Sequence, residues 1–343
     1  MATIVYPATI DYEWMYQRPQ QLLKAFAEQG HRTIFYNYDY FFKQKEPKIE
    51  LYPNFFLCRA EVPLEKIGID EPIVLWITYP NHVKYVGKFK EKLVVFDALD
   101  EPTGEFEFWA NDVDNIANKA DVIFATAKKM YDYHIKKHDN VHMCPNGADY
   151  EYFSKAQKLF APKPKDLPKN DRPIIGYFGA IASWIDWELI RYISTQNKHF
   201  NFVIIGPLYD KFRDPVRANN IYYLGRKDYS ELPKYLQWFD VCMIPFKVTP
   251  MIEGCNPIKM YEYLSAGKPV ITTNMPETSQ FKEIYIGRTK EEFNQKIHQV
   301  LLEKNNIDKI NQRIELAKNN SWTHRATEAL EVIEETLKNK FRK

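Results

Sequence analysis

Residues 254–272 read GCNPIKMYEYLSAGKPVIT, and this stretch decides the fold that we expect. Asn256 is a residue type that favours the N-cap of a helix, and Pro257 suits the first helical position. The apolar spacing that follows predicts a helix that ends at Gly267, before residues 268–273 begin a strand.

The start of this predicted helix has the features of an anion site. Gly254 lets backbone approach a ligand without a Cβ atom in the way, and unpaired N–H groups gather at a helix start. Lys259 adds a positive charge, and Glu262 follows on the same face. A diphosphate can sit at the helix start while Glu262 accepts hydrogen bonds from two sugar hydroxyls. The alternative is an ordinary capped helix with a Lys–Glu surface pair.

The same alternation of short β-rich runs and helical patterns extends over the whole chain and indicates an α/β fold with parallel sheets. We expect strands at residues 3–8, 31–38, 72–80, 92–99, 120–127 and 140–147, and again at 172–179, 201–207, 220–225, 240–246 and 268–273. Residues 154–173, rich in Lys and Pro, predict a linker. Two α/β domains should therefore face a central cleft, with ligands at the carboxyl ends of the strands.

Bulk properties exclude several classes of protein. The 343 residues favour two domains, and the net charge of +2 argues against a general nucleic-acid binder. The four cysteines have no metal or redox spacing and fit a reducing cytosol. We expect no signal peptide and no membrane span, because the N-terminus lacks a basic segment and no apolar run approaches about 18 residues.

Several motifs resemble those of GT-B glycosyltransferases of family 4. Residues 254–272 resemble the donor-binding helix of that family, CPNGADYEYF (144–153) the end of its N-terminal domain, LGRKDYSELPKYLQWFDVCMIPF (224–246) the segment before the donor helix, and NSWTHRATEAL (320–330) its late crossing helix. DYEWMYQRPQQL (11–22), VVFDALDE (94–101) and GAIASWIDWEL (179–189) resemble a narrower group, the bacterial teichuronic-acid-type and exopolysaccharide transferases.

This resemblance implies a GT-B fold with two Rossmann-like α/β domains. We expect an acceptor-binding domain at residues 1–165, a nucleotide-sugar-binding domain at 170–320, and a helix at 321–343 that packs back on the first domain. It implies a hexosyltransferase whose donor is a UDP-sugar, with UDP-glucuronate as one candidate, and whose acceptor is a cell-surface polysaccharide or lipid-linked glycan. From the resemblance and from position, the expected donor-binding residues are Glu262, Lys259, Gly254, Cys255, Asn256, Pro257, Arg226 and Gly179.

The acceptor side is expected in the first domain. Position in the first strand-to-helix loop selects Tyr12, Trp14, Gln17 and Arg18, because an aromatic ring can stack on a sugar and Arg18 can contact a phosphate. Asp97 and Asp100, at another expected strand end, are the candidate catalytic bases. For each carboxylate the alternative is a helix cap or a solvated charge.

This chain departs from the family pattern at one position. The family pattern has a Glu that contacts the donor sugar, but Gly254 stands at that position and Glu253 is its neighbour. The donor sugar and the stereochemistry, inverting or retaining, therefore stay open. Two other functions also stay open: a nucleotide-sugar 2-epimerase, and an inactive nucleotide-sugar-binding scaffold.

No cofactor and no metal are expected. Asp112 and Asp114 spell an Asp-x-Asp motif but fall in an amphipathic helix pattern. Ser183 with Asp186 reads as a capping box, and His82 with Asn81 follows a strand. The location expected is cytoplasmic. The Lys-rich stretches at 84–92 and 128–137 can contact anionic lipid at the membrane surface, and the alternative is that they are solvated helix faces.

Overall fold

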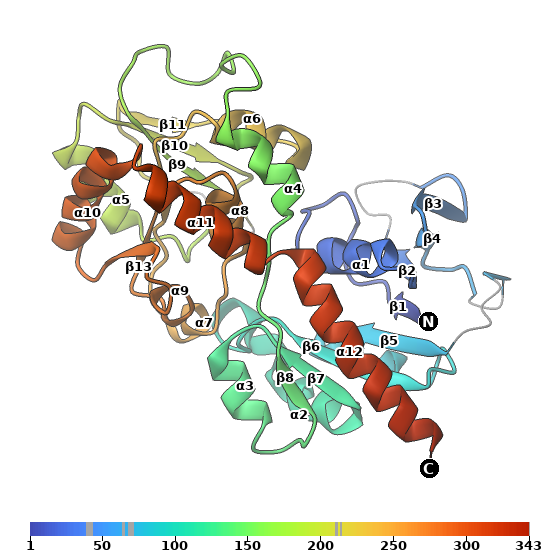
Figure 1. Cartoon of the computed structure of the whole chain (residues 1–343). Helices are drawn as coiled ribbons and strands as arrows, with labels where there is room; N and C mark the ends of the chain where they lie inside the picture. The colour runs from blue at the N-terminus through green and yellow to red at the C-terminus, as the bar shows by residue number, and fades with distance from the viewer. Residues whose placement is uncertain (39–43, 64–65, 68–71, 210–211, 213–214, 343) are drawn as a thin grey trace. The chain divides into compact units, whose positions relative to one another are not determined.

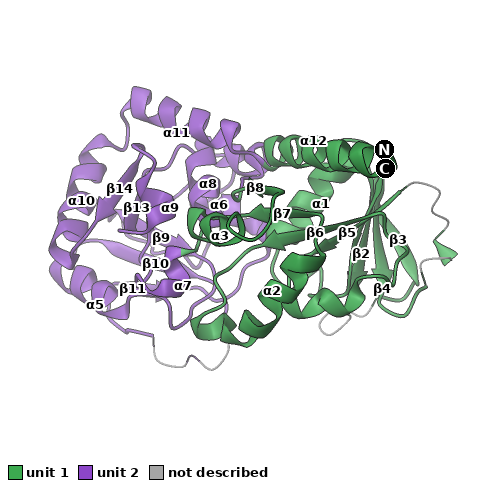
Figure 2. Ribbon diagram, turned by 90° about the horizontal axis from the view of Figure 1, so that it is seen from below, with its two compact units in different colours: residues 1–146, 254–256, 322–343 green, residues 147–253, 257–321 purple. Residues whose placement is uncertain are grey.

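The computed structural model describes residues 1–38, 44–63, 66–67, 72–209, 212 and 215–342 (Figure 1). Its chain divides into two compact units (Figure 2). Unit 1 comprises Met1–Asn146, Gly254–Asn256 and Trp322–Lys343, and unit 2 comprises Gly147–Glu253 and Pro257–Ser321. The chain thus passes from one unit to the other at residues 146/147, 253/254, 256/257 and 321/322.

Unit 1 is built on an eight-stranded sheet in the order β3-β4-β2-β1-β5-β6-β7-β8. Its strands are β1 (Thr3–Tyr6), β2 (Arg32–Asn37), β3 (Lys48–Tyr52), β4 (Phe55–Arg59), β5 (Ile73–Ile77), β6 (Leu93–Ala98), β7 (Val122–Ala125) and β8 (Val141–Met143). The pairs are parallel apart from the antiparallel β3–β4 hairpin at one edge.

The helices of unit 1 are α1 (Arg18–Glu28), α2 (Ala110–Lys119), α3 (Lys128–His134) and α12 (Trp322–Phe341), with 3-10 helices η2 (Pro80–Tyr85) and η3 (Gly104–Trp109). α12 packs along α1 (Figure 2). The Gln29 side chain, just after α1, donates to the Thr323 carbonyl at 3.0 Å and accepts from the Thr327 hydroxyl at 3.2 Å.

Side chains alternate between the two faces of the strands. Leu75, Phe96 and Ile123 join one core with residues of η2, α2 and α3. On the neighbouring positions, Trp76 stacks on Phe124 and contacts Phe26 of α1. Asp97 follows Phe96 in β6, so its side chain points to the opposite face of the sheet. This is the face that carries Trp76 and is covered by α1.

Unit 2 has a six-stranded, all-parallel sheet in the order β11-β10-β9-β12-β13-β14. Its strands are β9 (Ile174–Phe178), β10 (Asn201–Ile205), β11 (Ile221–Tyr223), β12 (Val241–Ile244), β13 (Val270–Thr273) and β14 (Ile284–Gly287). The helices are α4 (Tyr150–Phe153), η4 (Ser154–Gln157), α5 (Trp187–Gln196), η5 (Tyr229–Glu231), α6 (Leu232–Leu236), α7 (Pro250–Glu253), α8 (Ile258–Ser265), α9 (Pro276–Ser279), α10 (Lys290–Glu303) and α11 (Ile307–Asn319).

The predicted α/β fold class is confirmed, and every expected strand contains an observed one. The prediction missed β3, β4 and β14. The edge strand β3 alternates exposed and half-buried residues, so it lacks the continuous apolar run of a buried parallel strand. Its turn to β4 depends on Asn54, which adopts a φ of 67°.

The segment 154–173, expected to be a linker, is held against unit 2. The Gln157 side chain donates to the Ser265 carbonyl at 2.8 Å, and the amide of Phe160 donates to the Gln237 side chain at 2.9 Å. The first unit therefore ends at Asn146, earlier than the boundary at 165 that composition suggested, because tertiary hydrogen bonds attach this Lys- and Pro-rich segment to unit 2.

Candidate functional site

The helix that the opening stretch predicts is α8, but its start differs by one residue from the prediction. α8 begins at Ile258, so Pro257 occupies the N-cap position and provides no side-chain cap. Asn256, predicted as the N-cap, instead accepts a hydrogen bond from the amide of Asn146 at 3.1 Å. With no side-chain cap, the first N–H groups of α8 keep the anion-binding character of a helix start.

Lys259 lies at the carboxyl ends of the strands of unit 2. Its ammonium nitrogen is 4.8 Å from the ring centre of Phe246, after β12, and 5.5 Å from that of Tyr177, in β9. Gly179, just past β9, has a φ of 139°, and a Cβ atom there would lie 2.8 Å from Lys259 Cε. The absence of a side chain at Gly179 thus makes room for the Lys259 stem, while the two rings favour a cation beside them.

Glu262 is 5% exposed and comes one helical turn after Lys259. Burial raises the pKa of its carboxyl from 4.5 to about 8; the Lys259 charge lowers that pKa and the Asp149 charge raises it. Among the residues that the structure describes, none donates a hydrogen bond to this carboxylate. A buried acid that lacks hydrogen-bond donors is costly to the fold, and a ligand whose hydroxyls donate to it would offset that cost.

The remaining expected donor residues have varied surroundings. Cys255 is half-buried and Gly254 is buried in the segment ahead of α8, and Arg226 is exposed after β11. Gly176, in β9, makes room for core packing and not for a ligand, because a Cβ atom there would lie 2.0 Å from the Phe239 ring. Gly206, which the sequence analysis did not single out, is where a Cβ atom would meet the Gly179 carbonyl oxygen at 1.8 Å.

In unit 1, the expectation that Asp97 is a catalytic base does not fit its surroundings. Its side chain is 0% exposed and accepts hydrogen bonds from Arg18 Nε at 2.9 Å, Arg18 Nη2 at 2.8 Å and Trp76 Nε1 at 3.0 Å. β6 continues to Ala98, so Asp97 lies inside the strand and not after it. A carboxylate with both oxygens engaged by buried donors is a structural anchor.

Arg18, expected to contact an acceptor, is the other half of this anchor. It is 2% exposed as the first residue of α1. Its Nη1 atom donates to the Pro145 carbonyl at 3.2 Å and to Asn146 Oδ1 at 3.3 Å, and its guanidinium lies 5.8 Å from the Trp322 ring centre. The sequence offered no signal for this pairing, since its two members are 79 positions apart.

Asp100 has the surroundings that Asp97 lacks. It is half-buried in the loop after β6, and burial raises the pKa of its carboxyl to about 6. No cation or hydrogen-bond donor in the described part of the chain contacts it. The carboxylate is therefore available to a hydroxyl and is mostly ionised at neutral pH, as a general base requires.

The other expected acceptor residues divide into packed and accessible ones. Tyr12 is a core residue, with its ring edge against Phe35 and Phe55, so it does not serve as a sugar platform. Gln17 occupies the N-cap of α1, where its amide donates to Gln20 Oε1 at 3.3 Å. Trp14 is half-buried in the loop between β1 and α1, where stacking on a sugar stays a prediction.

Three minor candidates also have structural partners. His82 is buried, contacts Thr9 Oγ1 at 3.1 Å, and has its pKa lowered to about 4 by burial. Asp114 accepts from Tyr133 at 2.7 Å and pairs with Lys137 at 2.9 Å on the surface of α2. Asp186, rather than Ser183, caps α5 by accepting from the amide of Leu189.

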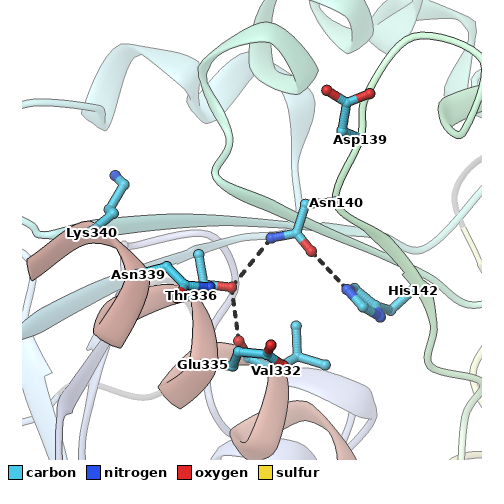
Figure 3. Close-up of a pocket in the computed structure, with 8 residues that line it drawn as sticks. All are labelled: Asp139, Asn140, His142, Val332, Glu335, Thr336, Asn339 and Lys340. Atoms are coloured by element: carbon cyan, nitrogen blue, oxygen red, sulfur yellow. Dashed lines mark hydrogen bonds between the residues drawn. The ribbon is translucent and has the colours of Figure 1, made fainter. Parts of the chain in front are cut away.

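A cavity of about 400 Å³ lies away from these groups, at the amino end of β8 in unit 1 (Figure 3). It is lined by Asp139, Asn140, His142, Val332, Glu335, Thr336, Asn339 and Lys340. Since β6, β7 and β8 are parallel, the loop that carries Asp100 is at the opposite edge of the sheet. The Asn140 side chain joins β8 to α12 there by donating to Thr336 Oγ1 at 3.2 Å.

Within the described ranges, no helix has both the length and the apolar composition needed to cross a membrane. The sequence analysis did not identify Tyr177 and Phe246, the two rings beside Lys259. Both residues lie at the ends of β-rich runs, and this position is the signal that could have identified them.

Comparisons with known proteins agree with this geometry. Residues 172–315 match the family model described as "Glycosyl transferases group 1". A Bacillus subtilis (strain 168) protein, provisionally named teichuronic acid biosynthesis glycosyltransferase TuaH, is 26% identical over 243 residues, which are 63% of this chain. The match spans 59% of that relative's length.

Solved structures share the fold over almost the whole chain. Sucrose-phosphate synthase of Thermosynechococcus elongatus has a TM-score of 0.71 at 14% identity, covering 98% of this chain and 99% of that one. Anabaena HepE in complex with UDP also has a TM-score of 0.71, at 11% identity, covering 98% and 100%. The trehalose-6-phosphate synthase of Burkholderia multivorans has a TM-score of 0.69 at 10% identity, covering 97% and 98%.

The expected GT-B fold is confirmed by these neighbours, and the expected resemblance is confirmed by the family model and the TuaH relative. The helix α8, with Lys259 and Glu262, lies inside the matched residues. Residues 172–315 of this chain match the group 1 glycosyltransferase family model, and the chain shares the GT-B fold of the solved structures.

Proposed function

We propose that this chain is a glycosyltransferase that moves a sugar from a UDP-sugar to a hydroxyl group of a glycan or lipid-linked glycan. The observation that carries the proposal is Glu262, a buried acid that accepts no hydrogen bond from the described residues and lies one turn after Lys259. A ribose offers two adjacent hydroxyls, and both can donate to one carboxylate. The family match over residues 172–315 and the UDP bound to HepE support the choice of donor.

The diphosphate of the donor is placed on the first amides of α8 and on Lys259. Charge builds on the leaving diphosphate as the bond to the sugar breaks, and oriented N–H groups with a fixed cation stabilise that charge. These groups supply the positive charge that a metal provides in other transferases. We therefore expect transfer to continue in EDTA.

The acceptor is placed in unit 1, next to Asp100, with Trp14 as the candidate stacking residue. In an inverting reaction the acceptor oxygen attacks the anomeric carbon, UDP leaves with the electron pair of the broken C–O bond, and Asp100 takes the hydroxyl proton. In a retaining reaction the leaving phosphate takes that proton and no protein base is needed. With a pKa of about 6, Asp100 is mostly ionised at neutral pH and is able to take the proton in the first form.

Incubation with UDP-glucose, UDP-N-acetylglucosamine and UDP-glucuronate, each with and without membrane lipid extract, tests the proposal. A transferase releases UDP when the extract supplies the acceptor, and EDTA does not stop it. A 2-epimerase changes the sugar without extract, and a scaffold binds UDP without any turnover. Either of the last two results would refute the proposal. The location at the cytoplasmic face of a membrane stays a prediction.

A further inference from the structure

Residues 179–186, which join β9 to α5, form a loop that borders Lys259 within unit 2. A Cβ atom at Gly179 would lie 2.8 Å from Lys259 Cε, so the loop begins against the stem of that lysine. Near the end of the loop, Ile185 forms an antiparallel bridge with Phe246, whose ring centre is 4.8 Å from the Lys259 ammonium nitrogen. The loop therefore lies beside the cation that the proposed function gives to the diphosphate.

Main-chain hydrogen bonds hold this loop between the segments that follow β10 and β12. On the β10 side, the Ile181 amide donates to the Pro207 carbonyl at 2.8 Å, and the Tyr209 amide donates to the Ile181 carbonyl at 2.9 Å. On the β12 side, the Lys247 amide donates to the Trp184 carbonyl at 2.8 Å. The loop is thus tied on both sides, and these bonds fix the backbone that carries Trp184.

The loop turns the ring of Trp184 away from the core. Ile185 and Phe246 lie opposite each other at the bridge, and both are buried, at 1% and 3% exposure. Because neighbouring residues of an extended segment point to opposite faces, Trp184 lies on the outer face, where it is half-buried. Its ring centre is 5.1 Å from that of Tyr209, which is also half-buried. Two partly exposed aromatic rings therefore lie together on the outer face of this loop.

We propose that Trp184, with Tyr209 beside it, is the subsite for the donor's sugar, a pyranose that stacks on the exposed part of these rings. This inference rests on the proposed function. A pyranose presents C–H groups on one face, and aromatic rings pack on such an apolar surface. The diphosphate joins the ribose to the sugar, so a ribose at Glu262 leaves the sugar on the other side of Lys259, where this loop begins.

The test compares UDP with UDP-glucose, UDP-N-acetylglucosamine and UDP-glucuronate, because only the three UDP-sugars can use the rings. Calorimetry on Trp184→Ala should show the ratio of UDP-sugar to UDP affinity reduced about three- to tenfold for at least one of the sugars. The affinity for UDP itself should stay at the wild-type value. Trp184→Phe keeps an aromatic face and should retain most of the ratio, and Tyr209→Ala should lower it by a smaller factor.

Trp238→Ala is the matched control. Trp238 is also a half-buried tryptophan of unit 2, but it precedes β12 and so lies at the opposite edge of the parallel sheet from the loop after β9. Its ratio of UDP-sugar to UDP affinity should stay at the wild-type value. Should Trp184→Ala fail to fold, Trp184→Leu replaces it, since leucine keeps apolar volume without an aromatic face, and it should show the same selective loss.

Two results would overturn the inference. An unchanged ratio for all three sugars in Trp184→Ala would show that the ring does not contact the sugar. An equal loss of UDP and UDP-sugar affinity would show that the ring serves the nucleotide or only supports the loop. A wild-type protein that does not bind UDP would overturn the proposed function as well, and so the two failures are distinguishable.

Discussion

Asp97 in unit 1 and Glu262 in unit 2 are both buried acids, at 0% and 5% exposure, yet their surroundings are opposite. Asp97 accepts three hydrogen bonds from Arg18 and Trp76, whereas Glu262 accepts none from the described residues. Burial alone therefore does not identify a functional acid. What distinguishes Glu262 is that its carboxylate still needs donors, and a ligand can provide them.

Breaking the paired acid should have the largest effect. Asp97→Ala leaves Arg18 buried without a counter-charge, which typically costs about 3–5 kcal/mol of stability. Denaturant unfolding measures this loss directly. The double change Arg18→Met with Asp97→Leu should recover much of it, because no uncompensated charge remains. A single variant as stable as wild type would show that the pair does not anchor unit 1.

Asp100→Asn tests the acid of unit 1 that has no hydrogen-bond or ion-pair partner among the described residues. If Asp100 is the base, transfer should fall about a hundredfold or more while UDP affinity and melting temperature stay near wild type. The wild-type rate should also decline as the pH falls through about 6, where the carboxyl takes up a proton. Unchanged turnover in Asp100→Asn would favour a retaining reaction without a protein base.

Glu262→Ala tests the unpaired acid of unit 2. Loss of hydrogen bonds from the ribose to a charged group should weaken UDP binding by about 1–3 kcal/mol, measured by calorimetry. The melting temperature of the ligand-free protein should not fall, because the change removes an unpaired buried acid and not a satisfied one. Equal UDP affinity in the variant and wild type would refute the ribose assignment.

The raised pKa of Glu262 gives the smallest expected effect. Between 4.5 and about 8 the folded protein holds a proton that the unfolded chain has lost, so this group makes stability fall as the pH rises through that window. Uridine needs the ionised carboxylate, so its affinity should rise roughly twentyfold between about pH 6.5 and 8.5. Glu262→Gln should remove both dependences, and a wild-type affinity that is flat with pH would contradict the assignment.

Local chemistry in the sequence was sufficient for much of the fold. Apolar β-rich runs between helical patterns located the buried parallel strands, because such strands need continuous apolar residues. The edge strand β3 was missed for the same reason, since it alternates exposed and half-buried residues and shows no apolar run. The sequence also predicted that Lys259 and Glu262 lie on one short helix, because the start and spacing of that helix are local properties.

Only the tertiary structure decided which acids and cations are paired. Asp97 and Asp100 look alike in FDALDE, but β6 ends at Ala98 and α1 brings Arg18 onto Asp97 from 79 positions away. In the same way, Asn256 looks like a helix cap in the sequence but pairs with Asn146, 110 positions away. Sequence patterns determine what a residue can do within a turn or a strand, whereas hydrogen bonds across the fold determine which of its atoms remain available to a ligand.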